Sequence, residues 1–171
     1  MIDPHVHLRD WEQSSKETLR HGLMTARRAG LDGVFEMPNT NPALTNRAAV
    51  KKRVQLADDA KIPVFHGIYG GLTADPRQIE EIVSVHRELF PRVVGLKLYA
   101  GHSTGNMGLT ASDAQDLVFR KLAELDYRGV LAVHCEKEEL IRYDLFKPEK
   151  PFSHTLARVP AAETESIQGI I

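Results

Sequence analysis

The first ten residues hold the side chains with the clearest potential for chemistry. His5 and His7 lie two positions apart, and Arg9 follows at the same interval. Side chains alternate between the two faces of a strand, so in a strand over 2–8 these three would share one face and the apolar residues would occupy the other. Neutral imidazole is a favoured ligand of zinc and similar ions, so the pair could bind one divalent metal. A solvent-facing pair in an ordinary strand is the alternative interpretation.

Composition limits the class of protein. The 171 residues are 42% hydrophobic with a formal net charge of −1, which favours one globular domain over 1–171. Lys and Arg number 22 against 23 Asp and Glu, so no basic field suggests nucleic acid as a partner. No apolar run approaches the length of a membrane span and no signal-like start is present, so we expect a cytoplasmic protein with no membrane partner. One cysteine, Cys135, excludes a disulfide framework.

Five apolar segments are expected to form strands. They begin near residues 2, 33, 63, 93 and 129, a spacing of about thirty residues that is typical of strand-helix-strand units. Helices are expected between them, and the last begins near Ala161. The residues expected to cap the four intervening helices are Ser14 with Glu17, Asn46, Asp75 before Pro76, and Thr110 with Asp113.

Such repeated units require a parallel sheet with right-handed crossovers. The polar residues decide between an open sheet and a barrel, because five of them fall at or just beyond the ends of different strands, where a strand-helix barrel has its active site. These are His5, His7, Asn39, Lys97 and His134. We therefore predict an α/β fold, a partial TIM-like barrel of about five parallel strands with flanking helices. It is incomplete relative to the eight-unit fold, which needs about 250 residues.

Four short motifs in order resemble the dihydroorotases, metal-dependent enzymes of the amidohydrolase superfamily. They are DPHVHLRD at 3–10, MPNT at 37–40, GLKLY at 95–99 and VHCE at 133–136. SHTLAR at 153–158 adds a fifth similarity. These motifs are spread from residue 3 to residue 158, and the similarity runs in order from Met1 to about Ile171. The segment 100–106 falls where related enzymes have a mobile segment over the substrate.

The resemblance implies a site for zinc, with one or two divalent ions. His5 and His7 would hold the first ion and His134 the second, and Lys97, carboxylated by carbon dioxide, would bridge them. An unmodified lysine is cationic near neutral pH, whereas its carbamate is an anion with two oxygens. Two ions sharing a hydroxide would allow water to attack a ring amide at neutral pH. Taken alone, Lys97 could instead be a surface lysine, and His134 a hydrogen-bonded core histidine.

The same resemblance implies that Arg9 and Asn39 bind a substrate carboxylate, since a guanidinium offers paired donors to a carboxylate. The reaction would be the interconversion of N-carbamoyl-L-aspartate and dihydroorotate in pyrimidine biosynthesis. One alternative is another cyclic amidohydrolase of the hydantoinase, dihydropyrimidinase or allantoinase type. A second is a non-catalytic module that keeps part of the metal site.

The sequence departs from the family pattern in its later part. A histidine at the end of strand six and an aspartate at the end of strand eight, which acts as the general base, have no counterpart in the 171 residues. We therefore expect a fragment with little or no activity alone, which forms a homo-oligomer or pairs with a complementing chain through its exposed strand edges. The remaining histidines receive no metal role, and His21 and His86 are expected at the surface.

Overall fold

The computed structural model describes residues 1–102 and 106–171, so 103–105, within the segment predicted to be mobile, lie outside the described residues. Its centre is one sheet of five parallel strands in the order β1-β2-β3-β4-β5. The strands are β1 (Ile2–Val6), β2 (Gly33–Glu36), β3 (Phe65–Gly71), β4 (Val93–Ala100) and β5 (Val130–Cys135). Strand order therefore follows chain order, as in a barrel wall.

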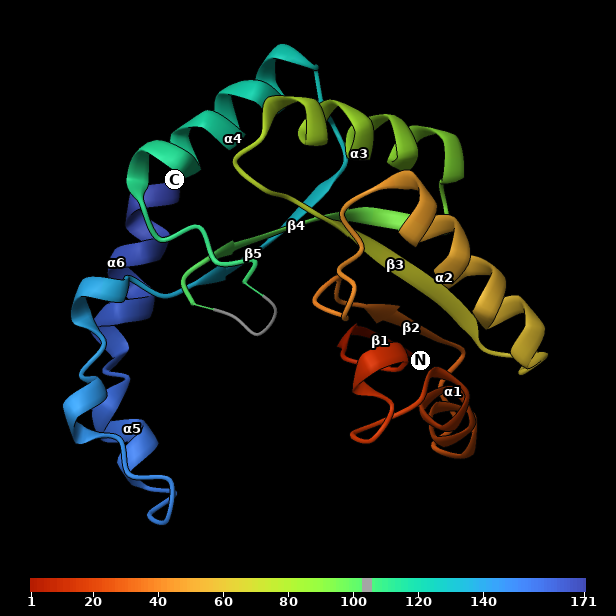
Figure 1. Ribbon diagram of the computed structural model, residues 1–171, viewed down its shortest axis with the longest axis horizontal. Coiled ribbons are helices and arrows are strands. Elements are labelled where there is room, and N and C mark those ends of the chain that lie inside the picture. Colours follow the sequence, from red (N-terminus) through yellow and green to blue (C-terminus); the bar gives the residue numbers. More distant parts are fainter. Residues whose placement is uncertain (103–105) are drawn as a thin grey trace.

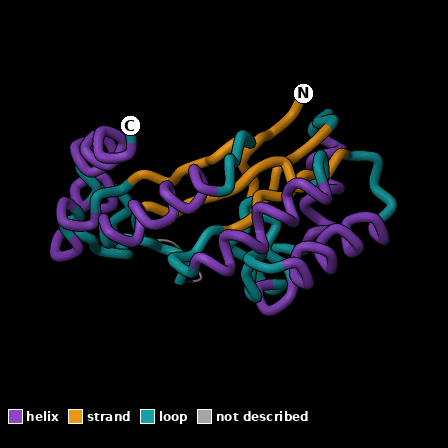
Figure 2. Tube along the Cα trace, turned by 90° about the horizontal axis from the view of Figure 1, so that it is seen from above, coloured by secondary structure: helices purple, strands orange, loops and turns teal. Residues whose placement is uncertain are grey.

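Helices cover the outer face of this sheet. They are α1 (Leu19–Arg28), α2 (Arg47–Ala60), α3 (Pro76–Leu89) and α4 (Ser112–Glu124). In Figure 1 they follow an arc around the strands, and the view from above shows them to one side of the sheet (Figure 2). The arrangement is a half-barrel, which confirms the predicted partial TIM-like fold.

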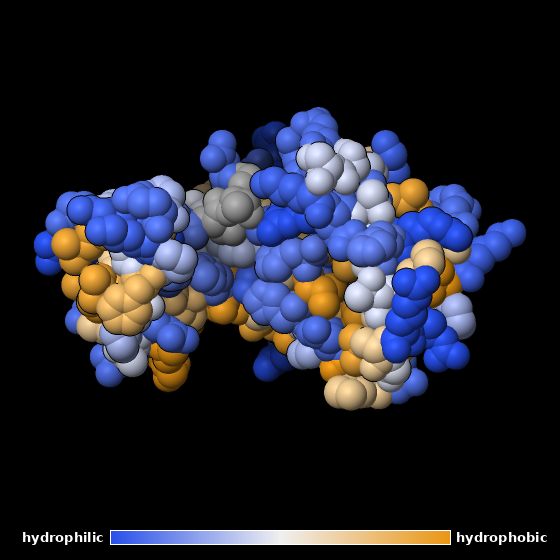
Figure 3. Space-filling view, turned by 90° about the horizontal axis from the view of Figure 1, so that it is seen from below, coloured by the Kyte–Doolittle hydropathy of each residue, from blue (hydrophilic) through white to orange (hydrophobic). Residues whose placement is uncertain are grey.

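The last part of the chain extends away from the arc. After β5 come two 3₁₀ turns, Glu138–Leu140 and Tyr143–Leu145, and the helices α5 (Ser153–Ala157) and α6 (Pro160–Ile170). Apolar side chains are visible on this projecting part, at the left of Figure 3, and those exposed there include Phe146, Phe152 and Leu156. In the part of the chain that the structure describes, no helix has the length and apolar character needed to cross a membrane.

Two of the four predicted helix caps are confirmed. The Asn46 side chain accepts a hydrogen bond from the Ala49 amide at 2.9 Å, and Asp75 accepts one from Arg77 at 2.9 Å. These bonds satisfy amides that have no partner inside the helix.

The other two caps were predicted wrongly. Thr18, rather than Ser14 with Glu17, caps α1, because the Asp10 amide donates to the Glu17 carbonyl and holds 10–17 in a compact turn until Thr18. The N-cap position of α4 is Ala111, which makes no side-chain cap bond. Asp113 instead accepts from the adjacent Ala114 amide.

The first strand is shorter than predicted, ending at Val6 instead of Leu8. The backbone of 9–11 has positive φ angles and turns the chain sharply away from the sheet. His7 and Arg9 therefore lie just beyond the strand end, while Leu8 is buried against α1.

The main core lies between the sheet and the helices. It contains fully buried Ile68, Leu96, Ile79, Ile82 and Val118 from β3, β4, α3 and α4. Burying each such side chain contributes about 1.5–3 kcal/mol. His86 was predicted at the surface but is buried, because its Nδ1 donates to the Val93 carbonyl at 2.8 Å where β4 begins.

Candidate metal and substrate site

Three of the predicted metal ligands line one pocket at the C-terminal ends of the strands. His5 of β1, Lys97 of β4 and His134 of β5 border a pocket of about 670 Å³. The ring of His7 lies 5.3 Å from that of His5, centre to centre. Within the described ranges, no three His, Cys, Asp or Glu side chains are close enough together to hold a metal ion.

Lys97 lies in an environment unusual for a lysine. The residue is 2% exposed, and among the described groups no carboxylate contributes to the shift of its pKa. The Nζ instead lies 5.0 Å from the centre of the Tyr99 ring, a cation–π contact. Burial lowers the pKa of Lys97 to about 8, against a smaller opposite effect of Cys135. A buried amine of this kind is suited to reaction with carbon dioxide, because only the neutral amine is nucleophilic.

His7 is oriented by Asn39. The Asn39 Oδ1 lies 2.7 Å from His7 Nδ1, and since the amide oxygen accepts, Nδ1 carries the proton and Nε2 remains as the ligating nitrogen. Burial lowers the pKa of His7 despite the bond to Asn39, and burial together with the charge of Lys97 lowers that of His5. Both rings are therefore favoured in the neutral form that binds metals.

Arg9 lies beside Asn39, as expected for two residues that share a ligand. The Nη1 of Arg9 donates to the backbone carbonyl of Asn39 at 3.4 Å. The two residues come from the segments after β1 and β2, which are neighbouring strands of the sheet. The structure thus brings the predicted carboxylate-binding pair next to the predicted metal ligand His7.

His134 has a partner that sequence reasoning missed. Its Nε2 lies 3.0 Å from Glu136, whose carboxylate also accepts from Arg158. Burial alone would raise the pKa of Glu136, but the bonds from Arg158 and His134 outweigh it and lower the pKa. A metal ion bound by His134 must therefore use Nδ1 or displace Glu136. The positions of Glu136 and Arg158 inside the motifs VHCE and SHTLAR were the signal that could have identified them.

A buried ionic network next to the site was also missed. Arg53 of α2 and Glu36 of β2 are fully buried and bonded to each other, and His66 of β3 contacts Glu36 at 2.9 Å. The available signal was a glutamate inside an apolar strand and an arginine on the apolar side of a helix. His66 was assigned no ligand role, and its Nε2 is engaged by Glu36.

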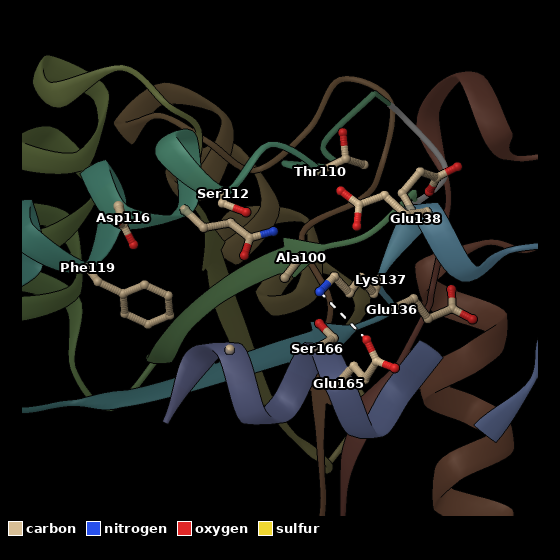
Figure 4. A pocket seen from close by; sticks show the side chains of 13 residues that line it. Ala100, Thr110, Ser112, Asp116, Phe119, Glu136, Lys137, Glu138, Glu165 and Ser166 are labelled. Atoms are coloured by element: carbon tan, nitrogen blue, oxygen red, sulfur yellow. Dashed lines mark ion pairs between the residues drawn. The ribbon is translucent and has the colours of Figure 1, made fainter. Parts of the chain in front are cut away.

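A smaller pocket of about 100 Å³ lies beyond β4, between α4 and α6 (Figure 4). Carboxylates of Asp116, Glu138 and Glu165 line it, and Lys137 forms an ion pair with Glu165 at 3.7 Å. None of the six predicted site residues lines this pocket, so it is not the candidate site.

Comparison with known proteins shows homology to dihydroorotases. The chain is 29% identical over 174 residues to a dihydroorotase of Methanothermobacter thermautotrophicus, an alignment that covers all of this chain and 37% of that enzyme. The chain therefore spans a little over a third of that relative. No family model matches the sequence.

Solved structures with the same fold include both predicted enzyme types. An L-hydantoinase (dihydropyrimidinase) of Arthrobacter aurescens superposes with a TM-score of 0.80 at 23% identity, over 98% of this chain and 37% of that one. A Saccharomyces cerevisiae dihydroorotase in complex with 5-fluoroorotic acid gives 0.68 at 23% identity, over 99% and 42%. These similarities support the half-barrel architecture.

Proposed function

We propose that this chain, a homologue of the dihydroorotases of the amidohydrolase superfamily, supplies the first part of a metal-dependent active site for cyclic amide hydrolysis. The observation that carries the proposal is the convergence of His5, Lys97 and His134 on one pocket, with His7 beside them. These residues come from three strands and are distant in the sequence, which makes a chance grouping of surface residues a poor explanation.

The donor set fits divalent ions such as zinc. His5 and His7 would hold one ion through neutral imidazoles, His134 would hold a second, and a Lys97 carbamate would bridge the two. When bound, the ions would make a water molecule nucleophilic at neutral pH and polarise the ring amide carbonyl. Asn39 fixes the His7 ring through Nδ1, so that Nε2 faces away from this hydrogen bond.

The substrate proposed is dihydroorotate, formed reversibly from N-carbamoyl-L-aspartate. Arg9 would bind the ring carboxylate through its guanidinium, next to Asn39. A hydantoinase or dihydropyrimidinase substrate lacks this carboxylate and has no need of Arg9. Substitution of Arg9 should therefore distinguish the two substrate types.

Zinc content tests the metal site. We expect about one to two zinc ions per chain after dialysis against zinc, measured by inductively coupled plasma mass spectrometry. His5→Ala should lower the content and His21→Ala should not, because His21 is exposed on α1 and paired with Glu17. Equal zinc content in both variants and the wild type would contradict the proposal.

Carbon-13 NMR tests the lysine modification. In ¹³C-bicarbonate the wild-type chain with zinc should show a carbamate carbonyl resonance that Lys97→Gln lacks. An identical spectrum from both proteins would remove Lys97 from the proposed ligand set.

Calorimetric titration tests the substrate class. Arg9→Met should weaken dihydroorotate binding by about tenfold or more, since a charge-assisted bond to a carboxylate is lost. Binding of dihydrouracil, which lacks the carboxylate, should not change. Unchanged dihydroorotate binding in Arg9→Met would favour a hydantoinase-type substrate instead.

A partner chain is the last part of the proposal. The edge strands β1 and β5 each leave an apolar residue exposed, Ile2 at 52% and Val130 at 57%. Such edges pair readily with other strands, so we propose self-association or assembly with a complementing chain. Light scattering should give a mass above the 19.1 kDa of one chain, and a stable monomer would contradict self-association.

A further inference from the structure

The segment that carries Arg9 has an unusual backbone. Arg9, Asp10 and Trp11 have φ angles of 50°, 68° and 50°, a left-handed region that L side chains rarely adopt. Three such residues in succession do not hold this shape by local preference, so neighbouring groups must stabilise it.

Part of this support is the Asp10 amide, which donates to the Glu17 carbonyl, and the Asp10 carboxylate, which accepts from the Leu19 amide. A further part comes from one side chain outside the segment, Arg53 of α2. Its Nη2 donates to the Arg9 carbonyl at 3.1 Å, and its guanidinium lies 4.9 Å from the centre of the Trp11 ring. Its Nη1 lies 3.8 Å from the Asp10 carboxylate. Arg53 therefore contacts each of the three residues in the left-handed region.

On its side facing the sheet, Arg53 is held by residues of β2 and β3. Its Nε donates to Glu36 Oε2 at 2.8 Å and its Nη2 to Glu36 Oε1, a two-point ion pair in which both side chains are fully buried. His66 lies 2.9 Å from the same Glu36 oxygen. The guanidinium is thus fixed from the sheet side and contacts 9–11 with its remaining surface.

We infer that Arg53 is a positioning residue that fixes the turn at 9–11 and thereby aims the Arg9 side chain at the carboxylate of the substrate. The role of Arg9 in this inference rests on the proposed function. The claim that Arg53 fixes the turn at 9–11 is independent of that function. Arginine suits this role because its planar fork can bind a carboxylate, donate to a carbonyl and stack on an aromatic ring together. A lysine can keep a charge beside Glu36 but cannot make the three contacts at once.

Trp11 is the only tryptophan of the chain, so its fluorescence reports on this turn alone. In Arg53→Lys and Arg53→Met we expect acrylamide quenching of Trp11 to rise about twofold, because the stacking group is lost. Arg92→Met is the matched control: Arg92 bonds to Asp58 of α2 and to the His66 carbonyl of β3 but does not contact 9–11. Quenching should be unchanged there, with native far-UV circular dichroism in the folded variants.

A measurement on the wild-type chain keeps the inference testable if the Arg53 variants do not fold. A nuclear Overhauser effect between the guanidinium protons of Arg53 and the indole protons of Trp11 is expected in the native protein. Its absence would overturn the inference, as would a Trp11 signal equal in folded Arg53→Lys and wild type.

The functional part is tested by two ligands. Arg53→Lys should weaken dihydroorotate binding by about tenfold while leaving binding of dihydrouracil unchanged, since only the carboxylate depends on Arg9. Equal weakening of both ligands would mean a general structural role and overturn the positioning role. If the wild type binds neither ligand, the proposed function fails, whereas the fluorescence and NMR results still decide whether Arg53 fixes the turn.

Discussion

The two sides of the candidate site differ in how their polar residues are held. Beside β1 and β2, Arg53 and Glu36 form an ion pair with no exposed surface. Beside β5, His134 is 39% exposed at its side chain, and its partner Glu136 pairs with a partly exposed Arg158. The charges of the first side are buried and paired, whereas those of the second side are held by interactions that water can replace.

This difference indicates how the site is organised. The side that would bind the substrate carboxylate is preorganised by the interior of the half-barrel. The side that holds His134 depends on the projecting segment that contains Arg158, whose apolar side chains are themselves partly exposed. We expect perturbations of the first side to affect folding strongly and those of the second side to affect it little.

The largest effect is expected from Glu36→Leu, which removes the carboxylate that pairs with the buried Arg53 guanidinium at two points and leaves only that of Asp10, 3.8 Å away. Removing one partner of a buried ion pair costs about 3–5 kcal/mol of unfolding free energy, measured by urea denaturation. The double variant Glu36→Leu/Arg53→Met should be more stable than the single one, because no uncompensated charge remains. A double variant as unstable as the sum of both single variants would contradict this explanation.

Acid should weaken the same side of the site. Burial would raise the pKa of Glu36, but the bonds from His66 and Arg53 outweigh burial and hold it below the ordinary value of 4.5. Because the folded pKa is the lower one, Glu36 stabilises the protein above pH 4.5, and this contribution is lost as the pH falls through the folded value. Thermal unfolding from pH 7 downward should therefore show a flatter acid dependence in Glu36→Gln than in wild type. An equal dependence of the unfolding temperature on pH in both proteins would contradict this role of Glu36.

Two valines at the starts of neighbouring strands compare the interior of the sheet with its β5 edge through packing alone. Val93 of β4 is 0% exposed and Val130 of β5 is 57% exposed. Val93→Ala should cost about 2 kcal/mol of unfolding free energy, since two buried methyl groups are lost. Val130→Ala should cost less than about 0.5 kcal/mol. Equal losses in urea denaturation would mean that β5 is covered in solution, for example by a partner chain.

The smallest effect is expected from Glu136→Gln. A partly exposed ion pair contributes about 0–1 kcal/mol, so urea denaturation should show almost no change. A loss as large as that of Glu36→Leu would show that the side near β5 is as tightly held as the side near β2, and the contrast between them would disappear.

The architecture was predictable because it depends on repetition. Apolar segments spaced by about thirty residues identified five strands, and Asn46 and Asp75 marked helix starts by side chains that satisfy free amides. Parallel strands bring their C-terminal ends to one edge, so the convergence of His5, Lys97 and His134 followed from the topology. Their roles as metal ligands remain a prediction from the resemblance.

The details that escaped prediction depend on contacts between distant segments. Arg53 shares the apolar side of α2, but this position did not show that it would bind Glu36 and contact the turn at 9–11. At the start of α1 two capping residues competed: Ser14 with Glu17 matches a capping box, but the backbone bond from Asp10 to Glu17 keeps that segment out of the helix and Thr18 is the cap. In both places the sequence offered a candidate residue, and a contact with a distant segment decided the outcome.

The order of the strands has a consequence for how the proposed metal site would form. His5 lies at the beginning of the chain and His134 far along it, so a folding intermediate with only β1 to β3 formed would offer the His5–His7 pair alone. Pairing of distant segments is slow because the entropy of loop closure comes first. If the proposed site binds zinc, zinc uptake in a refolding experiment should lag behind the recovery of helical signal, because the ligands of β1, β4 and β5 meet only when all five strands have assembled. Zinc uptake would then report the completion of the half-barrel.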